Sequence, residues 1–226
     1  MDIKLSYTEQ GRGKPLFLLH GNGEDHHYFQ HQIKFFCQYY RIIAVDTRGH
    51  GSSPRGTAPF TIRQFADDLY ELFGQLEITK GNILGFSDGG NIALTFALNH
   101  PELVNKLILN GANLHPRGVK RQVQIPIEIG YRIAQAFARR SPKAKANAEM
   151  LGLMVNEPNF DPSELNALKM PVLVLAGTKD MISKQHTKQI HRNIPQSKLC
   201  FIKGDHFIAN KNPEEFNSIV FRFLQE

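Results

Sequence analysis

The sequence has few cysteines and no long apolar run, and these absences narrow its class. Cys37 and Cys200 each lie in an apolar stretch without a partner at metal-ligand spacing. We therefore predict no disulfide framework and no metal site. No segment approaches the roughly 18 apolar residues of a membrane span. Residues 1–15 carry charges of both signs and no apolar core, so we expect a cytoplasmic protein without a membrane partner.

Length and composition fit one globular domain. The chain has 226 residues, of which 41% are hydrophobic and 21% are charged. One hydrophobic core can serve a chain of up to roughly 250 residues. We therefore expect a single domain over residues 1–226, and no internal repeat or low-complexity segment argues otherwise.

Short β-rich runs alternate with longer segments of helical period. This alternation predicts an α/β fold with a mostly parallel sheet of about seven strands, flanked by helices. Most runs are continuously apolar, as expected of strands that are buried on both faces. The strands are expected at residues 3–8, 16–19, 42–46, 82–86, 106–110, 172–176 and 198–202.

Capping signals predict where several helices begin. Thr61 and Gln64 form a capping box before one apolar stripe, and Asn212 with Pro213 should open the last helix. Between residues 111 and 170 no strand signal occurs. Pro126 there is typical of a first helical turn, as is Pro142 behind a Ser141 cap, and Asp161 with Pro162 should open a short helix. We interpret residues 114–160 as a small helical lid inserted over one edge of the sheet.

The lid segment carries the whole positive excess of the chain. Residues 115–150 contain two acidic residues, Glu128 and Glu149, against a larger set of basic ones. We favour a solvated face of surface helices, although such a patch could also attract anionic substrates. We predict no nucleic-acid partner, because no stacking motif or binding module accompanies the charge. The basic residues are Arg117, Lys120, Arg121, Arg132, Arg139, Arg140, Lys143 and Lys145.

The strongest chemical signal is a serine in a glycine-rich turn. Residues 85–89, Gly-Phe-Ser-Asp-Gly, follow an expected strand and precede a helical stretch. A serine on such a sharp turn is held in a strained backbone conformation with its hydroxyl exposed. The flanking glycines are needed because a Cβ there would clash with the neighbouring chain. Ser87 is therefore the candidate nucleophile.

A serine nucleophile needs a base, and the base needs a carboxylate that orients it. Among ten histidines, His206 is singled out because it follows the last expected strand and falls at the sheet edge that carries Ser87. Asp180 follows the preceding strand at the same edge. Asp205 is the rival acid, but adjacent loop residues rarely face one another. The order Ser87, Asp180, His206 matches a known arrangement of this triad.

An oxyanion-binding loop completes the candidate site. His20-Gly21-Asn22-Gly23 follows the second expected strand, and glycines let a backbone approach a substrate closely. Acyl transfer develops negative charge on a carbonyl oxygen, which preorganised backbone donors stabilise. The expected donors are the amides of Asn22 and Asp88.

Five motifs together resemble the α/β-hydrolase superfamily, and they span nearly the full chain. They occupy residues 20–23, 46–53, 85–90, 177–180 and 204–206. The resemblance implies the α/β-hydrolase fold, the triad and oxyanion roles given above, and a structural role for the loop at 46–53.

The expected reaction is hydrolysis of a carboxylic ester of a small or medium acyl substrate, through an acyl-enzyme and without a cofactor. The same triad serves thioester and carbon–carbon bond hydrolysis, and a non-catalytic ligand-binding protein of this fold is the alternative from another class. We expect a monomer or a homodimer that binds a small molecule. Residues that flank the catalytic loops or recur along the lid are expected to line the pocket: Phe86, His26, Tyr28, Phe207, Ile129, Ile133 and Phe137.

Overall fold

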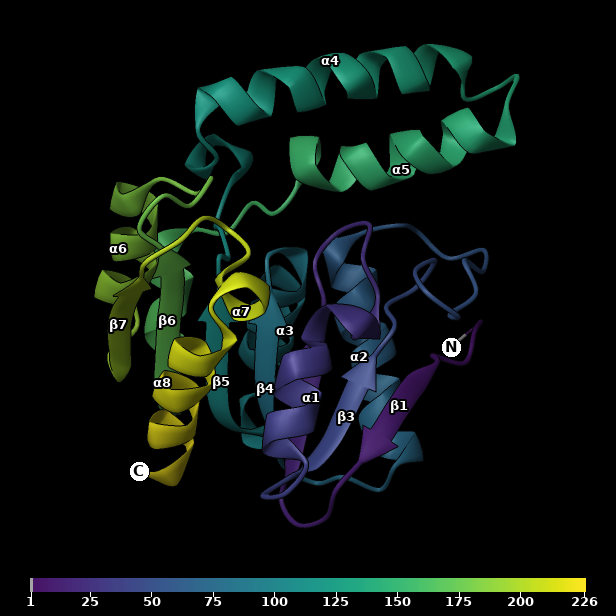
Figure 1. Cartoon of the computed structure of the whole chain (residues 1–226). Helices are drawn as coiled ribbons and strands as arrows, with labels where there is room; N and C mark the ends of the chain where they lie inside the picture. Colours follow the sequence, from purple (N-terminus) through teal and green to yellow (C-terminus); the bar gives the residue numbers. More distant parts are fainter. Residues whose placement is uncertain (1) are drawn as a thin grey trace.

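A seven-stranded sheet forms the centre of the chain, with helices on both faces (Figure 1). The computed structural model describes residues 2–226. The spatial order of the strands is β1-β3-β2-β4-β5-β6-β7, and every pairing is parallel except that of β1 with β3. The predicted fold class is confirmed. The strands are Tyr7–Gln10 (β1), Pro15–Leu19 (β2), Arg41–Val45 (β3), Gly81–Phe86 (β4), Val104–Asn110 (β5), Val172–Gly177 (β6) and Ser197–Ile202 (β7).

The first strand differs from its prediction. It was expected over residues 3–8, yet β1 covers Tyr7–Gln10 and runs antiparallel to β3 at the sheet edge. Its partner β3 ends at Val45, which pairs with Tyr7. Residues 3–5 therefore have no strand beside them, although their apolar pattern is that of a strand.

Helices cover the sheet in two layers. Helices α2 (Ile62–Gln75), α3 (Asp88–Asn99) and α6 (Lys184–Asn193) pack on one face. Helices α1 (Gln30–Phe36), α7 (Ile208–Lys211) and α8 (Pro213–Gln225) pack on the other. Short 3-10 helices span His26–Phe29, Pro101–Leu103, Pro116–Gly118 and Pro162–Ala167.

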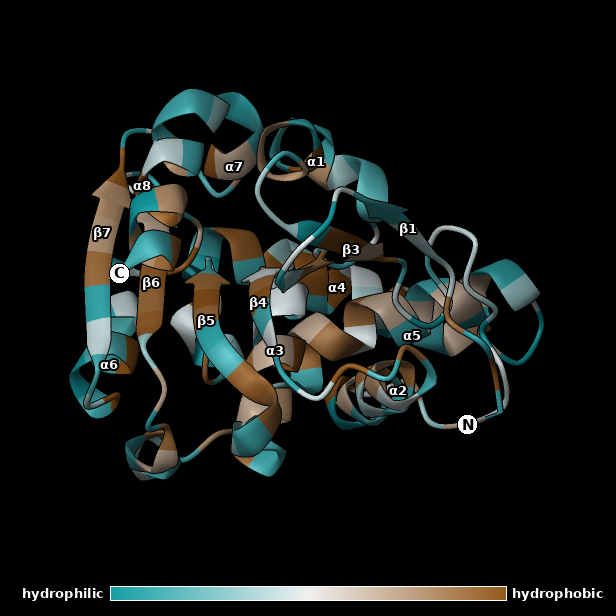
Figure 2. Ribbon diagram, turned by 90° about the horizontal axis from the view of Figure 1, so that it is seen from below, coloured by the Kyte–Doolittle hydropathy of each residue, from teal (hydrophilic) through white to brown (hydrophobic). Residues whose placement is uncertain are grey.

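Alternation along the strands divides the apolar residues between two cores. Phe17 of β2 stacks on Phe73 of α2 with ring centroids 4.1 Å apart, whereas Leu16 and Leu18 face the opposite core. This follows from the two-residue period of a strand. In Figure 2, β6 is coloured hydrophobic, as expected of a strand with a core on each face, whereas α6 is mainly hydrophilic.

The starts of α2 and α8 lie where the capping signals predict them. The Thr61 hydroxyl accepts a hydrogen bond from the Gln64 amide at the start of α2, as predicted. The last helix begins at Pro213, as predicted, but the Asn212 side chain makes no cap. Its amide nitrogen instead donates to the Glu215 carboxylate, because the acidic first turn attracts this donor.

The segment predicted as a lid contains an antiparallel pair of helices, α4 (Arg121–Phe137) and α5 (Pro142–Asn156). The pair lies beyond the end of the sheet to which the parallel strands point, with α5 between α4 and the rest of the molecule (Figure 1). Ser141 caps α5 and Asp161 caps the following 3-10 helix, as predicted. The expectation for Pro126 is wrong, since it lies inside α4. This helix starts earlier because the Lys120 carbonyl accepts bonds from Val123 and Gln124.

Among the helices of residues 2–226, none combines the length and the apolar character required to cross a membrane. Cys37 and Cys200 are free thiols.

A buried arginine holds the loop at residues 46–53 in place. The Arg48 guanidinium is fully buried, and its Nε and Nη2 atoms lie 2.7 Å from the two carboxylate oxygens of Asp68 on α2. Asp2 adds a third carboxylate oxygen at 2.7 Å from Nη2. A bidentate pair of this kind fixes a charged side chain in one orientation. The loop is therefore tied to both α2 and the N-terminal segment.

Candidate active site

Ser87 lies at the turn between β4 and α3, in a backbone conformation that residues other than glycine rarely adopt. Its φ is +53° and its ψ is −119°. The Ser87 amide donates to the Asn110 carbonyl of β5 at 2.8 Å, and the Ser87 carbonyl accepts from Gly90 and Asn91. These bonds hold the strained residue in place.

The glycines of this turn are required by close packing. A Cβ on Gly85 would lie 2.2 Å from the Gly89 carbonyl oxygen. A Cβ on Gly89 would lie 2.1 Å from the Leu19 carbonyl oxygen of β2. Any larger residue at either position would push the turn away from the sheet.

The structure brings together the three residues predicted as a triad. Nε2 of His206 lies 2.9 Å from Oγ of Ser87, and Nδ1 of His206 lies 2.7 Å from Oδ1 of Asp180. Each residue follows the carboxyl end of a different strand, namely β4, β6 and β7. His206 and Asp180 are buried, whereas Ser87 is partly exposed. One side of this hydrogen-bonded chain is therefore open to a substrate.

Neighbouring backbone groups fix the acid and the base. Asp180 accepts hydrogen bonds from the amides of Gly177 and Ile182. Gly111 adopts a φ of +66°, and a Cβ there would lie 2.6 Å from Cε1 of His206. The Phe86 ring packs against His206 with centroids 4.8 Å apart. The imidazole is thus confined from several sides.

The rival acid, Asp205, faces away from the imidazole of His206. Its carboxylate pairs with Lys211 and accepts from the Phe207 amide, near the protein surface. Of the two acids that the sequence left open, the structure places Asp180 on His206.

The loop at residues 20–23 lies beside Ser87, under α5. The Asn22 side chain donates to the Met150 carbonyl of α5 at 2.7 Å, which ties the loop to the helix pair. The Asn22 amide has no acceptor within residues 2–226. Asp88 is the first residue of α3, where a helix leaves its amides unpaired. Both predicted oxyanion donors are therefore available.

Two carboxyl groups near the nucleophile were not anticipated from the sequence. Glu24 accepts a hydrogen bond from the Gly21 amide at 3.1 Å, and burial raises the pKa of Glu24 to about 7. Burial likewise raises the pKa of Asp88 to about 6. Nδ2 of the Asn91 side chain donates to Oδ1 of Asp88, and Oδ2 of Asp88 has no partner in the described chain. Only the three-residue spacing from Gly21 to Glu24 could have signalled the first contact.

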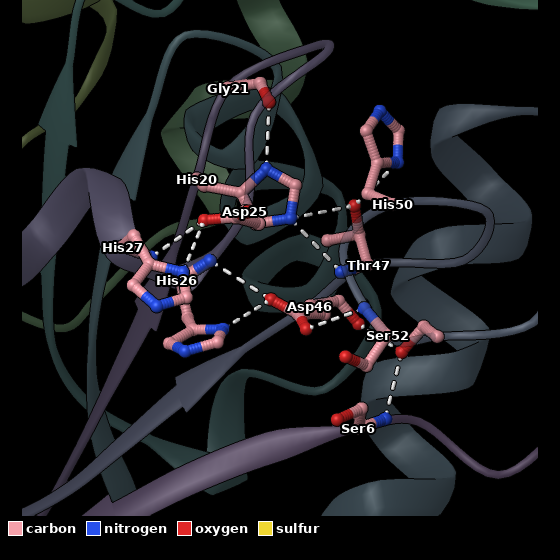
Figure 3. A network of polar contacts seen from close by, with 11 residues as sticks. Ser6, His20, Gly21, Asp25, His26, His27, Asp46, Thr47, His50 and Ser52 are labelled. Carbon is pink, nitrogen blue, oxygen red and sulfur yellow. Dashed lines mark hydrogen bonds and ion pairs between the residues drawn. The ribbon is translucent and has the colours of Figure 1, made fainter.

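Figure 3 shows a polar network around His20, at the start of the loop at 20–23. Nε2 of His20 accepts from the Thr47 amide at 3.1 Å, and Nδ1 of His20 lies 2.7 Å from the Gly21 carbonyl oxygen. Burial lowers the pKa of His20 to about 4. A neutral imidazole with its proton on Nδ1 satisfies both contacts. The network joins the loop at 20–23 to the loop at 46–53.

The residues predicted to line a pocket divide into three groups. Phe86 and Tyr28 are buried and stack with centroids 4.3 Å apart, beside the exposed Phe207. His26 turns away from this stack, because its Nδ1 lies 2.8 Å from Oδ1 of Asp46 (Figure 3). The remaining three, Ile129, Ile133 and Phe137, are exposed on α4.

One group of side chains could hold a metal ion. Ligand atoms of Asp25, His26 and His27 lie within 4.8 Å of one another. Nδ1 of His26 and Nδ1 of His27 are already engaged by the carboxylates of Asp46 and Asp25. A metal ion at this group would have to displace the contact between His27 and Asp25, or bind Nε2 of each histidine. The expectation of no metal site stays a prediction.

Comparison with known proteins identifies the family of this fold. The family model described as alpha/beta hydrolase fold matches residues 14–150. AB hydrolase superfamily protein YisY of Bacillus subtilis is 27% identical, over 98% of this chain and 95% of its own length. 3-Oxoadipate enol-lactonase 2 of Acinetobacter baylyi is 28% identical, over 97% of this chain and 92% of its own length.

Solved structures of an esterase and an enol-lactonase resemble this fold along nearly the whole chain. A thermophilic esterase from Thermogutta terrifontis superposes with a TM-score of 0.83 at 26% identity, over 99% of this chain and 93% of the esterase. The enol-lactonase from Burkholderia xenovorans superposes with a TM-score of 0.84 at 21% identity, over 99% of this chain and 97% of the lactonase. At that identity the second likeness supports the fold alone.

Proposed function

The chain belongs to the α/β hydrolase fold family, and we propose that it is a serine hydrolase that cleaves a carboxylic ester of a small or medium acyl substrate. Hydrolase is the general activity that the family and its named relatives support. An esterase and an enol-lactonase among the similar proteins favour an ester, because a lactone is a cyclic ester.

The observation that carries the proposal is the continuous chain of contacts from Ser87 through His206 to Asp180. Its two contacts measure 2.9 and 2.7 Å. Both are hydrogen-bond distances. The first allows proton transfer from Ser87 to His206, and the second lets Asp180 orient the imidazole. A binding protein of this fold would not need three residues from separate loops in this arrangement.

In the proposed mechanism Ser87 Oγ attacks the ester carbonyl carbon while His206 Nε2 accepts the hydroxyl proton. Asp180 stabilises the imidazolium that forms. His206 then donates this proton to the leaving alcohol, and the acyl group remains on Ser87. Water then attacks the acyl carbon while His206 Nε2 accepts its proton, and His206 returns this proton to Ser87 Oγ as the bond from the acyl carbon to Oγ breaks and the carboxylic acid leaves.

The amides of Asn22 and Asp88 are the proposed donors to the tetrahedral oxyanion. Removing one such donor costs about 3 to 4 kcal/mol of barrier in serine hydrolysis. Their placement is supported by the packing of the first turn of α3 on the loop at 20–23, because a Cβ on Gly89 would lie 2.5 Å from the His20 carbonyl oxygen.

We further propose that α4 and α5 form a lid within a single domain over residues 1–226. The Asn22 bond to Met150 and the close approach of Gly23 to the Met150 side chain support this role. The substrate would then enter beside α5 as a small molecule.

The test combines a fluorophosphonate probe, which labels activated serines, with burst kinetics on p-nitrophenyl acetate and butyrate. We expect labelling and a burst in the native chain and loss of both in Ser87→Ala. Ser52→Ala is the matched control, because Ser52 is an exposed serine of the loop at 46–53. Labelling that persists in Ser87→Ala would contradict the assigned nucleophile. Neither labelling nor turnover in the native chain would favour a binding protein, whereas labelling without ester turnover would favour thioester or carbon–carbon bond hydrolysis.

A further inference from the structure

Four large apolar side chains lie exposed in a row on α4. Ile125, Ile129, Ile133 and Phe137 follow one another at four-residue steps, which places them along one helix face. Their exposed fractions are 44%, 54%, 57% and 56%. We name these four residues the α4 stripe. Elsewhere in residues 2–226, the exposed large apolar residues are Tyr39, Tyr70 and Phe207.

The apolar surface continues from the α4 stripe onto α5. Ile133 and Phe137 line a groove together with Ala144 and Leu151 of α5, and Lys143 stands at its border. The exposed fractions of these side chains show that no other element of the described chain covers the α4 stripe, and α4 itself lies on the outer side of the helix pair (Figure 1). A contiguous exposed apolar surface of this kind marks an interaction site in soluble domains.

The helix pair that carries the α4 stripe is rich in exposed cations. Arg121 lines a pocket with Ile125, and Lys143 lines the groove with Ile133 and Phe137. The exposed basic residues of α4, α5 and the turn between them form no ion pair within residues 2–226. Glu149 is paired with Arg55, which leaves Glu128 as the one acidic side chain of the two helices without an ion pair in that range. The exposed basic residues are Arg121, Arg132, Arg139, Arg140, Lys143 and Lys145.

The charge decides between two occupants of this face. A second copy of the chain would bring the same cations against these, and like charges at an interface oppose association. An anionic lipid surface instead accepts apolar side chains and neutralises cations at the same time.

We propose that the α4 stripe and the exposed cations of the same helix pair form a docking surface for an anionic lipid bilayer. The apolar side chains enter the boundary between headgroups and acyl chains, and the arginines and lysines lie against the lipid phosphates. The helix lies on the bilayer and does not cross it. Docking of this kind replaces the sequence-based expectation of no membrane partner and does not rest on the proposed ester hydrolysis.

The test is co-sedimentation of the untagged full chain with vesicles of phosphatidylcholine alone or mixed with phosphatidylglycerol. We expect at least about ten-fold tighter binding to the anionic vesicles, weakened by salt at about 0.5 M because salt screens exposed charges. Ser87→Ala should bind as the native chain does, since docking does not use the reacting serine.

Variants separate the apolar and the charged contributions. Ile129→Asp with Ile133→Asp should abolish vesicle binding, and their exposure should leave the melting temperature unchanged. Arg132→Gln with Arg139→Gln should weaken binding roughly five-fold per cation removed. Lys188→Gln with Arg192→Gln on α6 removes the same charge from exposed positions elsewhere, and should weaken binding far less.

Three results would overturn the proposal. They are equal binding to neutral and anionic vesicles, retained binding in the double aspartate variant, and equal losses in the two charge variants. No vesicle binding, together with a dimer in analytical ultracentrifugation that the aspartate variant splits, would assign the face to a second copy.

Discussion

The imidazole of His206 lies with Nδ1 2.7 Å from Oδ1 of Asp180, and the Asp180 carboxylate is held by two backbone amides. This arrangement places the imidazole proton on Nδ1 and leaves Nε2 free to accept the Ser87 proton. Asp205 is adjacent in sequence but is engaged by Lys211. The two acids therefore provide a matched pair for testing the proposed mechanism.

Asp180→Asn should lower kcat for p-nitrophenyl butyrate by roughly 10⁴-fold, because the amide favours the wrong imidazole tautomer. Asp205→Asn should change kcat by less than about three-fold, as expected when only a surface ion pair is lost. Steady-state kinetics on both variants measure the difference. Similar losses in the two would contradict the assignment of Asp180 as the orienting acid.

Gly111→Ala should lower kcat by at least about ten-fold. The new methyl group would meet Cε1 of His206 at 2.6 Å, and the φ of +66° disfavours any side chain. The rate of fluorophosphonate labelling should fall with it. Gly74→Ala is the control, because nothing lies within 4 Å of its Cβ position. It should raise stability by about 0.5–1 kcal/mol and leave kcat unchanged, and an unchanged kcat in Gly111→Ala would refute the steric argument.

Glu24→Gln should become more stable than the native chain as pH rises. Burial raises the pKa of Glu24 from 4.5 to about 7, so within this window the folded chain keeps a proton that the unfolded chain has lost. The free energy of unfolding therefore falls as pH rises through the window. Glutamine keeps an acceptor for the Gly21 amide but has no proton to lose.

Melting curves at about pH 5 and about pH 8 measure this effect. After allowance for the partial exposure of Glu24, the advantage of the variant should grow by about 1 kcal/mol. This corresponds to about 2–4 °C in a chain of this size. A constant difference between the two pH values would show that Glu24 titrates in its ordinary range.

Asp68→Asn should lower the free energy of unfolding by about 3 kcal/mol, because it leaves the buried Arg48 charge with only Asp2 as its partner. Glu9→Gln removes the partner of Arg41 in a more exposed pair, and should lower it by less than about 1 kcal/mol. Urea titrations of both variants give the two values. A loss at Asp68 no larger than that at Glu9 would mean that the loop at 46–53 is held by other contacts.

Local signals explain why much of the site could be predicted from the sequence. Five consecutive residues, 85–89, predict the turn at Ser87. The strands that precede Asp180 and His206 predict where these two residues lie. Parallel strands bring their carboxyl ends to one edge, so strand prediction alone placed all three residues together.

Contacts that depend on how the loops fold could not be predicted in the same way. The Glu24 bond to Gly21 depends on the detailed shape of a loop, and the pairing of His26 with Asp46 joins two loops. Residues 3–5 have the pattern of a strand but lack a neighbouring strand to pair with. Pro126 resembles a helix start, although α4 begins before it. Solvent exposure of the α4 stripe was equally inaccessible, because a helical period does not reveal what lies against it.

The hydrogen bond from the Asn22 side chain to the Met150 carbonyl couples the position of the helix pair to that of the loop at 20–23. Any outward swing of α5 must break this bond or drag Asn22 along, and with it the amide proposed to hold the oxyanion. Conversely, negative charge gathered at that amide would favour the inward position of α5. Such reciprocity is a property of linked equilibria. A contact that displaces α4 and α5 would therefore also change how strongly the Asn22 amide stabilises the oxyanion.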